Sequence, residues 1–249
     1  MVILKLPDEI ERARASSQIV AEVLNKLRDK VKPGVTTNEL DKFAEEVARK
    51  RGAKPAFKGY RGYPYSLCTS VNEEVVHGMP SERILKEGDI ISLDFGVFYN
   101  GFFGDAAITL PVGKITDVAR KLIEVTEQSL YAGIEQAKKG NRLGDISSSV
   151  QQTVEPPGFS VVRDFVGHGI GRNLHEDPQI PNYGKKGRGI ELKSGMILAI
   201  EPMVNQGSYK VKILEDGWTV VTEDGMLSAH FEHSVAITDN GPEILSKLN

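Results

Sequence analysis

Apolar residues recur with helical spacing in four stretches of the chain. The first runs over 8–31, and the second runs from the predicted cap Thr37 to about residue 52. The same period returns over about 117–139 and 143–154, whereas alternation over 66–110 is typical of strands. The apolar stripes predicted for the first two helices consist of Ile10, Ile19, Val20, Val23, Leu24 and Leu27, then Leu40, Phe43, Ala44 and Val47.

The order of two helices followed by strands occurs twice. Lys32-Pro33-Gly34 ends the first helix, and Lys138-Lys139-Gly140 ends its counterpart 106 residues later. The pattern predicts an α+β protein with a sheet covered by helices on one face. We expect one catalytic domain over 1–249, made of two similar halves at about 1–110 and 111–249. The alternative is that the two joints match by chance, since sequences of this kind commonly end helices.

The segment ISLDFGVFYNGFFGDAAITL, residues 91–110, has the pattern of a buried hairpin around an Asn-Gly turn of type I′. In that register Asp94 lies opposite Ala107, and Asp105 lies opposite Gly96. The two aspartates then share one face as diagonal neighbours. The opposite face, which we expect beneath helices, consists of Ile91, Leu93, Phe95 and Val97.

Other polar groups also interrupt apolar strands. Glu201 ends the run MILAI, Glu232 shares a face with His230 and Ser234, and His168 stands between glycines in FVGHGIG. A buried carboxylate is costly unless it is paired, although each residue alone could be an edge acid or an ordinary core histidine. Four acids and one imidazole together suit two divalent ions in a hydrolytic centre better than a closed structural zinc site.

Composition narrows the class of protein. The 249 residues are 40% hydrophobic and 26% charged, as in an ordinary globular domain. A net charge of −3 gives no reason to expect nucleic acid or a membrane as partner. The single cysteine, Cys68, excludes an internal disulfide, and no apolar run approaches the roughly 20 residues of a membrane span. The N-terminus lacks a signal-peptide pattern, so we expect a cytoplasmic protein.

The five residues Asp94, Asp105, His168, Glu201 and Glu232, with GHGIG around the histidine and IEPMV around the first late glutamate, resemble type I methionine aminopeptidase. The resemblance covers almost the whole chain and includes the spacing of the two aspartates. It implies the pita-bread fold, a pseudo-twofold curved antiparallel sheet with helices on its outer face. It also implies hydrolysis of the N-terminal methionine from nascent polypeptides when the second residue is small.

The resemblance implies a role for each of the five residues. Asp94 would chelate one ion, Asp105 and Glu232 would bridge both ions, and His168 and Glu201 would complete the second. Glu201 would also be the proton shuttle. The two divalent ions would be cobalt, manganese, iron or zinc, and the oxygen-rich ligands favour the harder ions of this set.

Further site residues follow from the same resemblance. His77 and His175 would donate hydrogen bonds to the scissile peptide and the tetrahedral intermediate. The methionine side chain would enter an apolar and polarizable pocket. That pocket would consist of Phe57, Tyr60, Tyr63, Cys68, Leu174 and Trp218.

Additional expectations concern partners and departures from the family pattern. A monovalent cation could bind near Asn72, Glu74 and Ser228, and the enzyme would act as a monomer, near the ribosome, without requiring nucleic acid. Gly96 stands where relatives often carry a hydroxyl residue, and Leu174 where an aromatic is common. These differences concern metal preference and pocket shape.

Two other functions stay open from the sequence. A proline-specific peptidase of the same fold shares the five-ligand pattern but usually has an extra N-terminal domain. A catalytically silent relative that binds protein or RNA would typically have lost ligands, whereas all five are present here.

Overall fold

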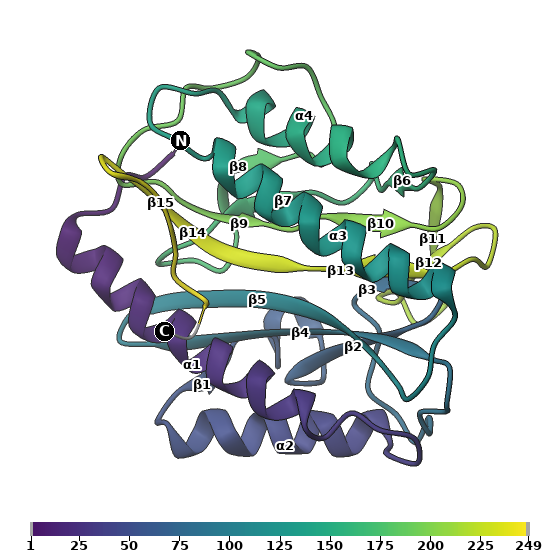
Figure 1. The fold of residues 1–249 in the computed structure, drawn as a ribbon. Coiled ribbons are helices and arrows are strands. Elements are labelled where there is room, and N and C mark those ends of the chain that lie inside the picture. The colour runs from purple at the N-terminus through teal and green to yellow at the C-terminus, as the bar shows by residue number, and fades with distance from the viewer. Residues whose placement is uncertain (1, 248–249) are drawn as a thin grey trace.

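The computed structural model describes residues 2–247 as a sheet with helices along its outer side (Figure 1). The helices are α1 (Pro7–Arg28), α2 (Thr37–Lys50), α3 (Asp117–Gln136) and α4 (Leu143–Val154), with a short 3-10 turn η1 (Tyr60–Gly62). All four predicted helices are therefore confirmed. The first and third end earlier than predicted, at Arg28 and Gln136. Among the described residues, no helix has the length and apolar character needed to cross a membrane.

The second helix is capped by Thr36, so the prediction of Thr37 was wrong by one residue. Thr36 Oγ1 accepts the N–H of Glu39 at 3.2 Å, and the Glu39 carboxylate accepts the N–H of Thr36 at 2.7 Å. This reciprocal pair is a capping box. Thr37 is buried instead, and its hydroxyl donates to the carbonyl of Ser81 at 3.1 Å.

The two joints that match in sequence also match in local structure. Gly34 and Gly140 have φ of 94° and 89°, and their N–H groups donate to Leu85 and Leu192, both at 2.9 Å. Glycine adopts this left-handed conformation without strain, which suits the turn that follows each helix. The agreement supports, as our proposal, the division of a single domain at about residue 110.

The main sheet has nine strands, and every pairing in it is antiparallel. Its order is β1-β4-β5-β14-β9-β7-β8, with β2 beside β4 and β15 beside β14. The bounds of these strands are β1 Lys54–Pro55, β2 Leu67–Val71, β4 Ile90–Tyr99, β5 Phe102–Pro111, β7 Gly167–Gly169, β8 Glu176–Ile180, β9 Ile197–Ile200, β14 Glu232–Thr238 and β15 Gly241–Ile244.

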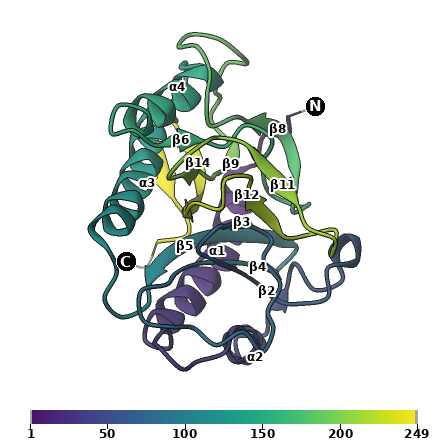
Figure 2. The ribbon, with the colours of Figure 1, turned by 90° about the vertical axis from the view of Figure 1, so that its right-hand side faces the viewer.

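Two three-stranded sheets complete the structure. Their strands are β13 (Ser228–His230), β10 (Met203–Asn205) and β6 (Ser160–Val161), then β11 (Val211–Ile213), β12 (Val220–Thr222) and β3 (Glu74–Val76). Figure 2 shows β11 and β12 on the side of the main sheet away from the helices.

The β4–β5 hairpin has the predicted register. Asp94 pairs with Ala107 and Gly96 pairs with Asp105, and both turn residues have positive φ, as a type I′ turn requires. The apolar face of β4 packs against α1 and α2 in the largest core cluster, as predicted. The face that carries the aspartates is therefore turned away from the helices.

Candidate metal centre

Five strands of the main sheet position the five predicted metal ligands. Asp94 and Asp105 lie within β4 and β5, and His168 lies in the middle of β7. Glu201 follows β9 directly, and Glu232 begins β14. Because these strands are neighbours in the order β4-β5-β14-β9-β7, the five side chains converge although their sequence positions are far apart.

The register explains how closely they converge. Ala107 pairs with Asp94 on one side and with Glu232 on the other, so the two acids flank one residue of β5. On the next strands, Ala199 pairs with His168. Alanine at both positions leaves room for the larger polar side chains beside it.

Glycines allow β7 to lie against its neighbours. A Cβ atom on Gly167 would collide with the carbonyl oxygen of Ala199, and one on Gly169 with that of Asp177. The glycines around His168 therefore allow close approach of the backbone.

Four buried acids repel one another in this site. Burial raises the pKa of Asp94 from 3.8 to about 7. Burial, with Glu232 and Asp94 nearby, raises the pKa of Asp105 well above its ordinary value. Burial and the neighbouring acids likewise raise the pKa values of Glu201 and Glu232. Nothing in the protein neutralises this cluster, since no lysine or arginine pairs with any of these acids among the described residues.

The arrangement fits divalent cations. Asp94 Oδ1, Asp105 Oδ1 and Glu232 Oε1 are buried and have no hydrogen-bond partner. Ligand atoms of Asp105, His168 and Glu232 all lie within 4.8 Å of one another, which is close enough to hold one ion. Unpaired carboxylate oxygens and an imidazole form a donor set that suits divalent metal.

His168 presents one ring nitrogen to this cluster. Its Nδ1 lies 2.9 Å from the carbonyl oxygen of Gly169, which can only accept, so Nδ1 carries the proton. The Nε2 lone pair is then free, and Nε2 lies 3.6 Å from Glu201 Oε1. A backbone contact of this kind orients metal-binding histidines. Burial lowers the pKa of His168 to about 4, so the ring is neutral at physiological pH.

A cavity of about 180 Å³ opens beside the carboxylates. All six residues predicted for a methionine pocket line it, together with His77 and His175. Tyr63 and Trp218 make an edge-to-face contact with ring centroids 5.1 Å apart. Sequence reasoning missed five further lining residues, Arg61, Val76, Phe165, Val166 and Met203. They come from separate elements, including β3 and β10, and their convergence depends on tertiary packing that no local pattern reveals.

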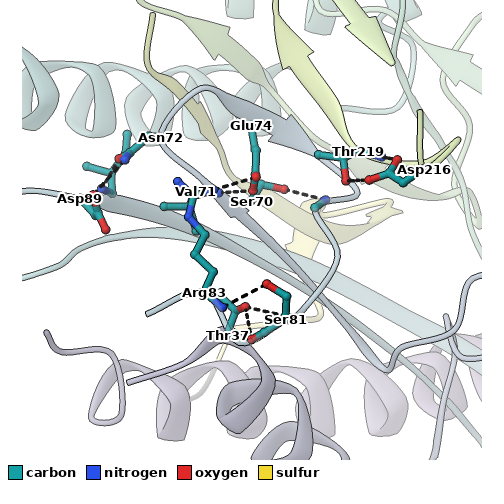
Figure 3. A network of polar contacts seen from close by, with 12 residues as sticks. Thr37, Ser70, Val71, Asn72, Glu74, Ser81, Arg83, Asp89, Asp216 and Thr219 are labelled. Carbon is teal, nitrogen blue, oxygen red and sulfur yellow. Dashed lines mark hydrogen bonds and ion pairs between the residues drawn. The ribbon is translucent and has the colours of Figure 1, made fainter. Parts of the chain in front are cut away.

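His77 stands at a strained turn beside this cavity, with φ of 60°. The following N–H, of Gly78, donates to Ser70 Oγ at 3.1 Å, and Tyr63 Oη donates to the Gly78 carbonyl at 3.1 Å. Figure 3 shows the contacts of β3, the strand that precedes His77. Glu74 in this strand accepts the N–H of Val71 at 2.8 Å and forms an ion pair with the guanidinium of Arg83. These contacts hold the backbone on both sides of His77, and burial lowers the pKa of its ring to about 4.

Asp216 holds Trp218 in a similar way. Its Oδ1 accepts the N–H groups of Trp218 and Thr219, both at 2.8 Å, and its Oδ2 accepts the Thr219 hydroxyl at 2.6 Å (Figure 3). The loop between β11 and β12 is therefore pinned by one carboxylate. Trp218 reaches the cavity from this loop.

His175 also lines the cavity. Its Nδ1 lies 2.9 Å from Tyr60 Oη, and its ring is 4.2 Å from that of His168, centroid to centroid. Partial removal from water, with His168 and Arg61 nearby, lowers the pKa of His175 to about 3. The two predicted non-ligand histidines are thus neutral rings on the cavity wall.

The predicted monovalent cation region is already well bonded by protein groups. Asn72 donates to Asp89 at 2.9 Å and accepts the N–H of Ile90 at 3.0 Å (Figure 3). The Ser228 hydroxyl donates to the carbonyl of Val204 at 3.2 Å. Any ion there would depend on backbone oxygens, and its presence stays a prediction.

His230 is a buried residue of this region that sequence reasoning placed on the ligand face without a role. It ends β13, is 1% exposed, and has its Nε2 3.8 Å from Glu201 Oε2. The sequence could have indicated a role for His230, because His230 and Glu232 are two positions apart in an extended segment and therefore lie on the same face.

Comparison with known proteins places the chain in a family. A model of metallopeptidase family M24 matches residues 11–239. Methionine aminopeptidase from Clostridium perfringens is 60% identical over 248 residues, and methionine aminopeptidase 1 from Bacillus subtilis is 55% identical over 248 residues, each match covering 100% of both chains.

Solved structures agree with these relatives. The crystal structure of methionine aminopeptidase from Thermotoga maritima matches with a TM-score of 0.98 at 51% identity and covers 100% of both chains. Prolidase from Pyrococcus furiosus shares the fold, with a TM-score of 0.81 at 24% identity over 99% of this chain and 66% of its own. The pita-bread fold and the resemblance drawn from the sequence are confirmed, and the chain belongs to metallopeptidase family M24.

Proposed function

We propose that this protein is a methionine aminopeptidase, which hydrolyses the peptide bond after an N-terminal methionine when the second residue is small. The observation that carries the proposal is the convergence of four unneutralised carboxylates and one imidazole at a cavity lined by aromatic and thiol groups. The full-length relatives named methionine aminopeptidase, at 55–60% identity, support the same activity.

We assign the binding of two divalent ions to Asp94, Asp105, His168, Glu201 and Glu232, through carboxylate oxygens and the free Nε2 of the histidine. Such ions, when bound, polarise a carbonyl and activate water for attack. The donor set supports a divalent metal, and we propose manganese, iron or cobalt before zinc because oxygen ligands predominate.

The chain's own residues orient the substrate. The thioether of methionine would lie among Tyr63, Cys68 and Trp218, where burial and sulfur–aromatic contact favour it. Phe57 and Leu174 narrow the apolar side of the cavity. A peptide bound this way presents its first carbonyl to the carboxylates.

We assign the proton movements to Glu201 and to the neutral rings of His77 and His175. The carboxylate of Glu201 would accept a proton from the attacking water and pass it to the leaving amine. Tyr60 Oη can donate to His175 Nδ1, which places that ring's proton on Nε2. His77 and His175 would then donate to the substrate's carbonyl oxygen as charge develops on it.

Peptide hydrolysis by the metal-reconstituted protein tests this function. We expect purified protein with Mn²⁺ to release methionine from Met-Ala-Ser and to leave Ala-Pro intact. Cleavage of Ala-Pro without cleavage of Met-Ala-Ser would identify a proline-specific peptidase instead. Metal binding without turnover of any Met-peptide would identify a silent relative.

The setting of the reaction is also a proposal. Nascent polypeptides carry the initiator methionine, so the substrate would be met in the cytoplasm, near the ribosome. We propose that one chain suffices, because each residue assigned above belongs to a single cavity of a single chain.

A further inference from the structure

His230 is firmly held by the backbone of the sheet. Its N–H donates to Thr109 Oγ1 at 2.9 Å, and the Thr109 hydroxyl donates back to the His230 carbonyl at 2.7 Å. The residue also pairs with Met203 across β13 and β10. The backbone of His230 is therefore fixed by β5, β10 and β13 together, and the residue is only 1% exposed.

One nitrogen of this ring lacks a partner. His230 Nε2 is buried and makes no hydrogen bond. Buried polar atoms of native proteins are nearly always bonded, so an exception requires an explanation. The acceptor it faces is Glu201 Oε2 at 3.8 Å, slightly beyond hydrogen-bond distance.

Glu201 consequently lies between two imidazoles. Its Oε1 is 3.6 Å from His168 Nε2, and its Oε2 is 3.8 Å from His230 Nε2. The two histidines differ in what their other contacts require. His168 uses Nδ1 as a donor and keeps Nε2 as a lone pair, whereas His230 Nε2 makes no hydrogen bond, lies near a carboxylate oxygen of Glu201 and can serve as a donor.

We propose that His230 is the positioning residue of Glu201, with Nε2–H donating to Oε2 and leaving Oε1 on the side of His168. Bond formation needs a shift of about 1 Å between the two side chains. The hydrogen bond would fix which oxygen of Glu201 faces the reacting groups. The role rests on the proposed function only in that Glu201 acts there as ligand and proton carrier.

Three substitutions of His230 distinguish a hydrogen bond to Glu201 from simple packing of the side chain. The amide nitrogen of His230→Gln can occupy the place of Nε2 and donate, whereas His230→Asn offers the same chemistry one methylene too short. His230→Leu fills space without a donor. The experiment titrates each metal-free variant with Mn²⁺ by calorimetry and then measures kcat and KM on Met-Ala-Ser, with melting temperatures to verify folding.

We expect His230→Gln to stay within about threefold of the parent in Mn²⁺ affinity and kcat, and Asn and Leu to lose roughly 10–100-fold in one or both, with little change in KM. Mn²⁺ affinity and kcat at the parent level in the Asn or Leu variant would overturn the proposal. So would a folded Gln variant as impaired as the Leu variant. The calorimetric arm needs no peptide, so failure of the proposed peptidase activity would be recognised separately.

Discussion

At the scale of single residues, the site is defined by carboxylate oxygens buried without partners. Asp94 Oδ1, Asp105 Oδ1 and Glu232 Oε1 accept no hydrogen bond from any described residue of the protein. Such groups destabilise a protein that lacks a cation and bind one strongly when it is present. The carboxylates that would bind a cation therefore lower the stability of the metal-free protein.

The raised pKa of Asp94 predicts a pH-dependent stability in chelator-treated protein. Because its folded pKa is about 7 and its ordinary value is 3.8, the folded state binds the extra proton between these values. The stabilisation is complete below about pH 4 and is lost as pH rises toward 7. We expect metal-free Asp94→Asn to melt above the parent at pH 7.5 by several degrees, with a smaller difference at pH 5.

The measurement is a pair of thermal melts after dialysis against chelator. Asp8→Asn, at an exposed carboxylate, is the control and should show no such pH-dependent difference. With metal restored, Asp94→Asn should instead lose nearly all peptidase activity. Equal melting temperatures for Asp94→Asn and parent at both pH values would contradict the repulsion described above.

Gly96 predicts a second effect at this scale. A Cβ atom there would lie 2.9 Å from Phe57 Cε1 and 3.2 Å from Asp105 Oδ1. The phenyl ring would have to move into the apolar cavity, and overpacking of this kind costs about 1–3 kcal/mol. We expect Gly96→Ala to raise KM for Met-Ala-Ser severalfold and to change kcat less. An unchanged KM would show that Phe57 does not form the pocket wall.

At the scale of elements, the loop between β7 and β8 is tied to the N-terminal segment. Lys5 Nζ contacts Glu176 Oε2 at 2.5 Å, with the two side chains only 3% and 4% exposed. Glu176 Oε1 also accepts the N–H of Asn173 at 3.0 Å. His175 precedes Glu176 directly, so this buried pair holds the end of the loop that carries it.

Breaking the pair should therefore disturb both stability and catalysis. Lys5→Met leaves Glu176 buried without its partner, at a cost of about 3–5 kcal/mol. We expect a clear loss of melting temperature and a fall in kcat on Met-Ala-Ser. Replacing both residues, as in Lys5→Met with Glu176→Gln, should be less harmful than Lys5→Met alone.

Arg172→Gln provides the matched control in the same loop. It removes an ion pair with Glu9 in which the arginine side chain is 60% exposed and the glutamate side chain 12%, and pairs that reach the surface in this way contribute about 0–1 kcal/mol. The control should melt close to the parent. If Lys5→Met were as mild as Arg172→Gln, the buried pair would not hold the loop.

The sequence predicts elements better than the contacts between them. The Asn-Gly pair was sufficient for the register of β4 and β5, because a two-residue turn permits few alternatives. The cap of α2 was ambiguous because Thr36 and Thr37 are chemically alike, and tertiary bonding to Ser81 decides between them. The buried ion pair between Lys5 and Glu176 could not be predicted from a local sequence pattern, since the two residues are distant in sequence.

At the scale of the whole molecule, the strand order brings both parts of the chain to one centre. The β4–β5 hairpin contributes Asp94 and Asp105, while β14 and the end of β9 contribute Glu232 and Glu201. Resemblance to a family predicted these residues as ligands from the sequence, and the order of strands explains why they converge. The roles assigned to them remain proposals.

Metal should stabilise the entire fold through this centre. Binding to the folded state alone contributes about 2.7 kcal/mol at a ligand concentration of 100 Kd. For a chain of this size that corresponds to a rise in melting temperature of about 5–10 °C. We expect Mn²⁺ to produce such a rise in chelator-treated parent and not in Asp105→Asn. An equal rise in both proteins would place the ion elsewhere.

The adjacency of β5 and β14 has a consequence for quality control during folding. A molecule in which β14 has not yet joined the sheet lacks Glu232 and offers an ion only a partial coordination sphere. If Glu232 is a ligand as proposed, a complete metal centre requires that β14 has docked against β5, so an incompletely folded molecule would bind metal more weakly.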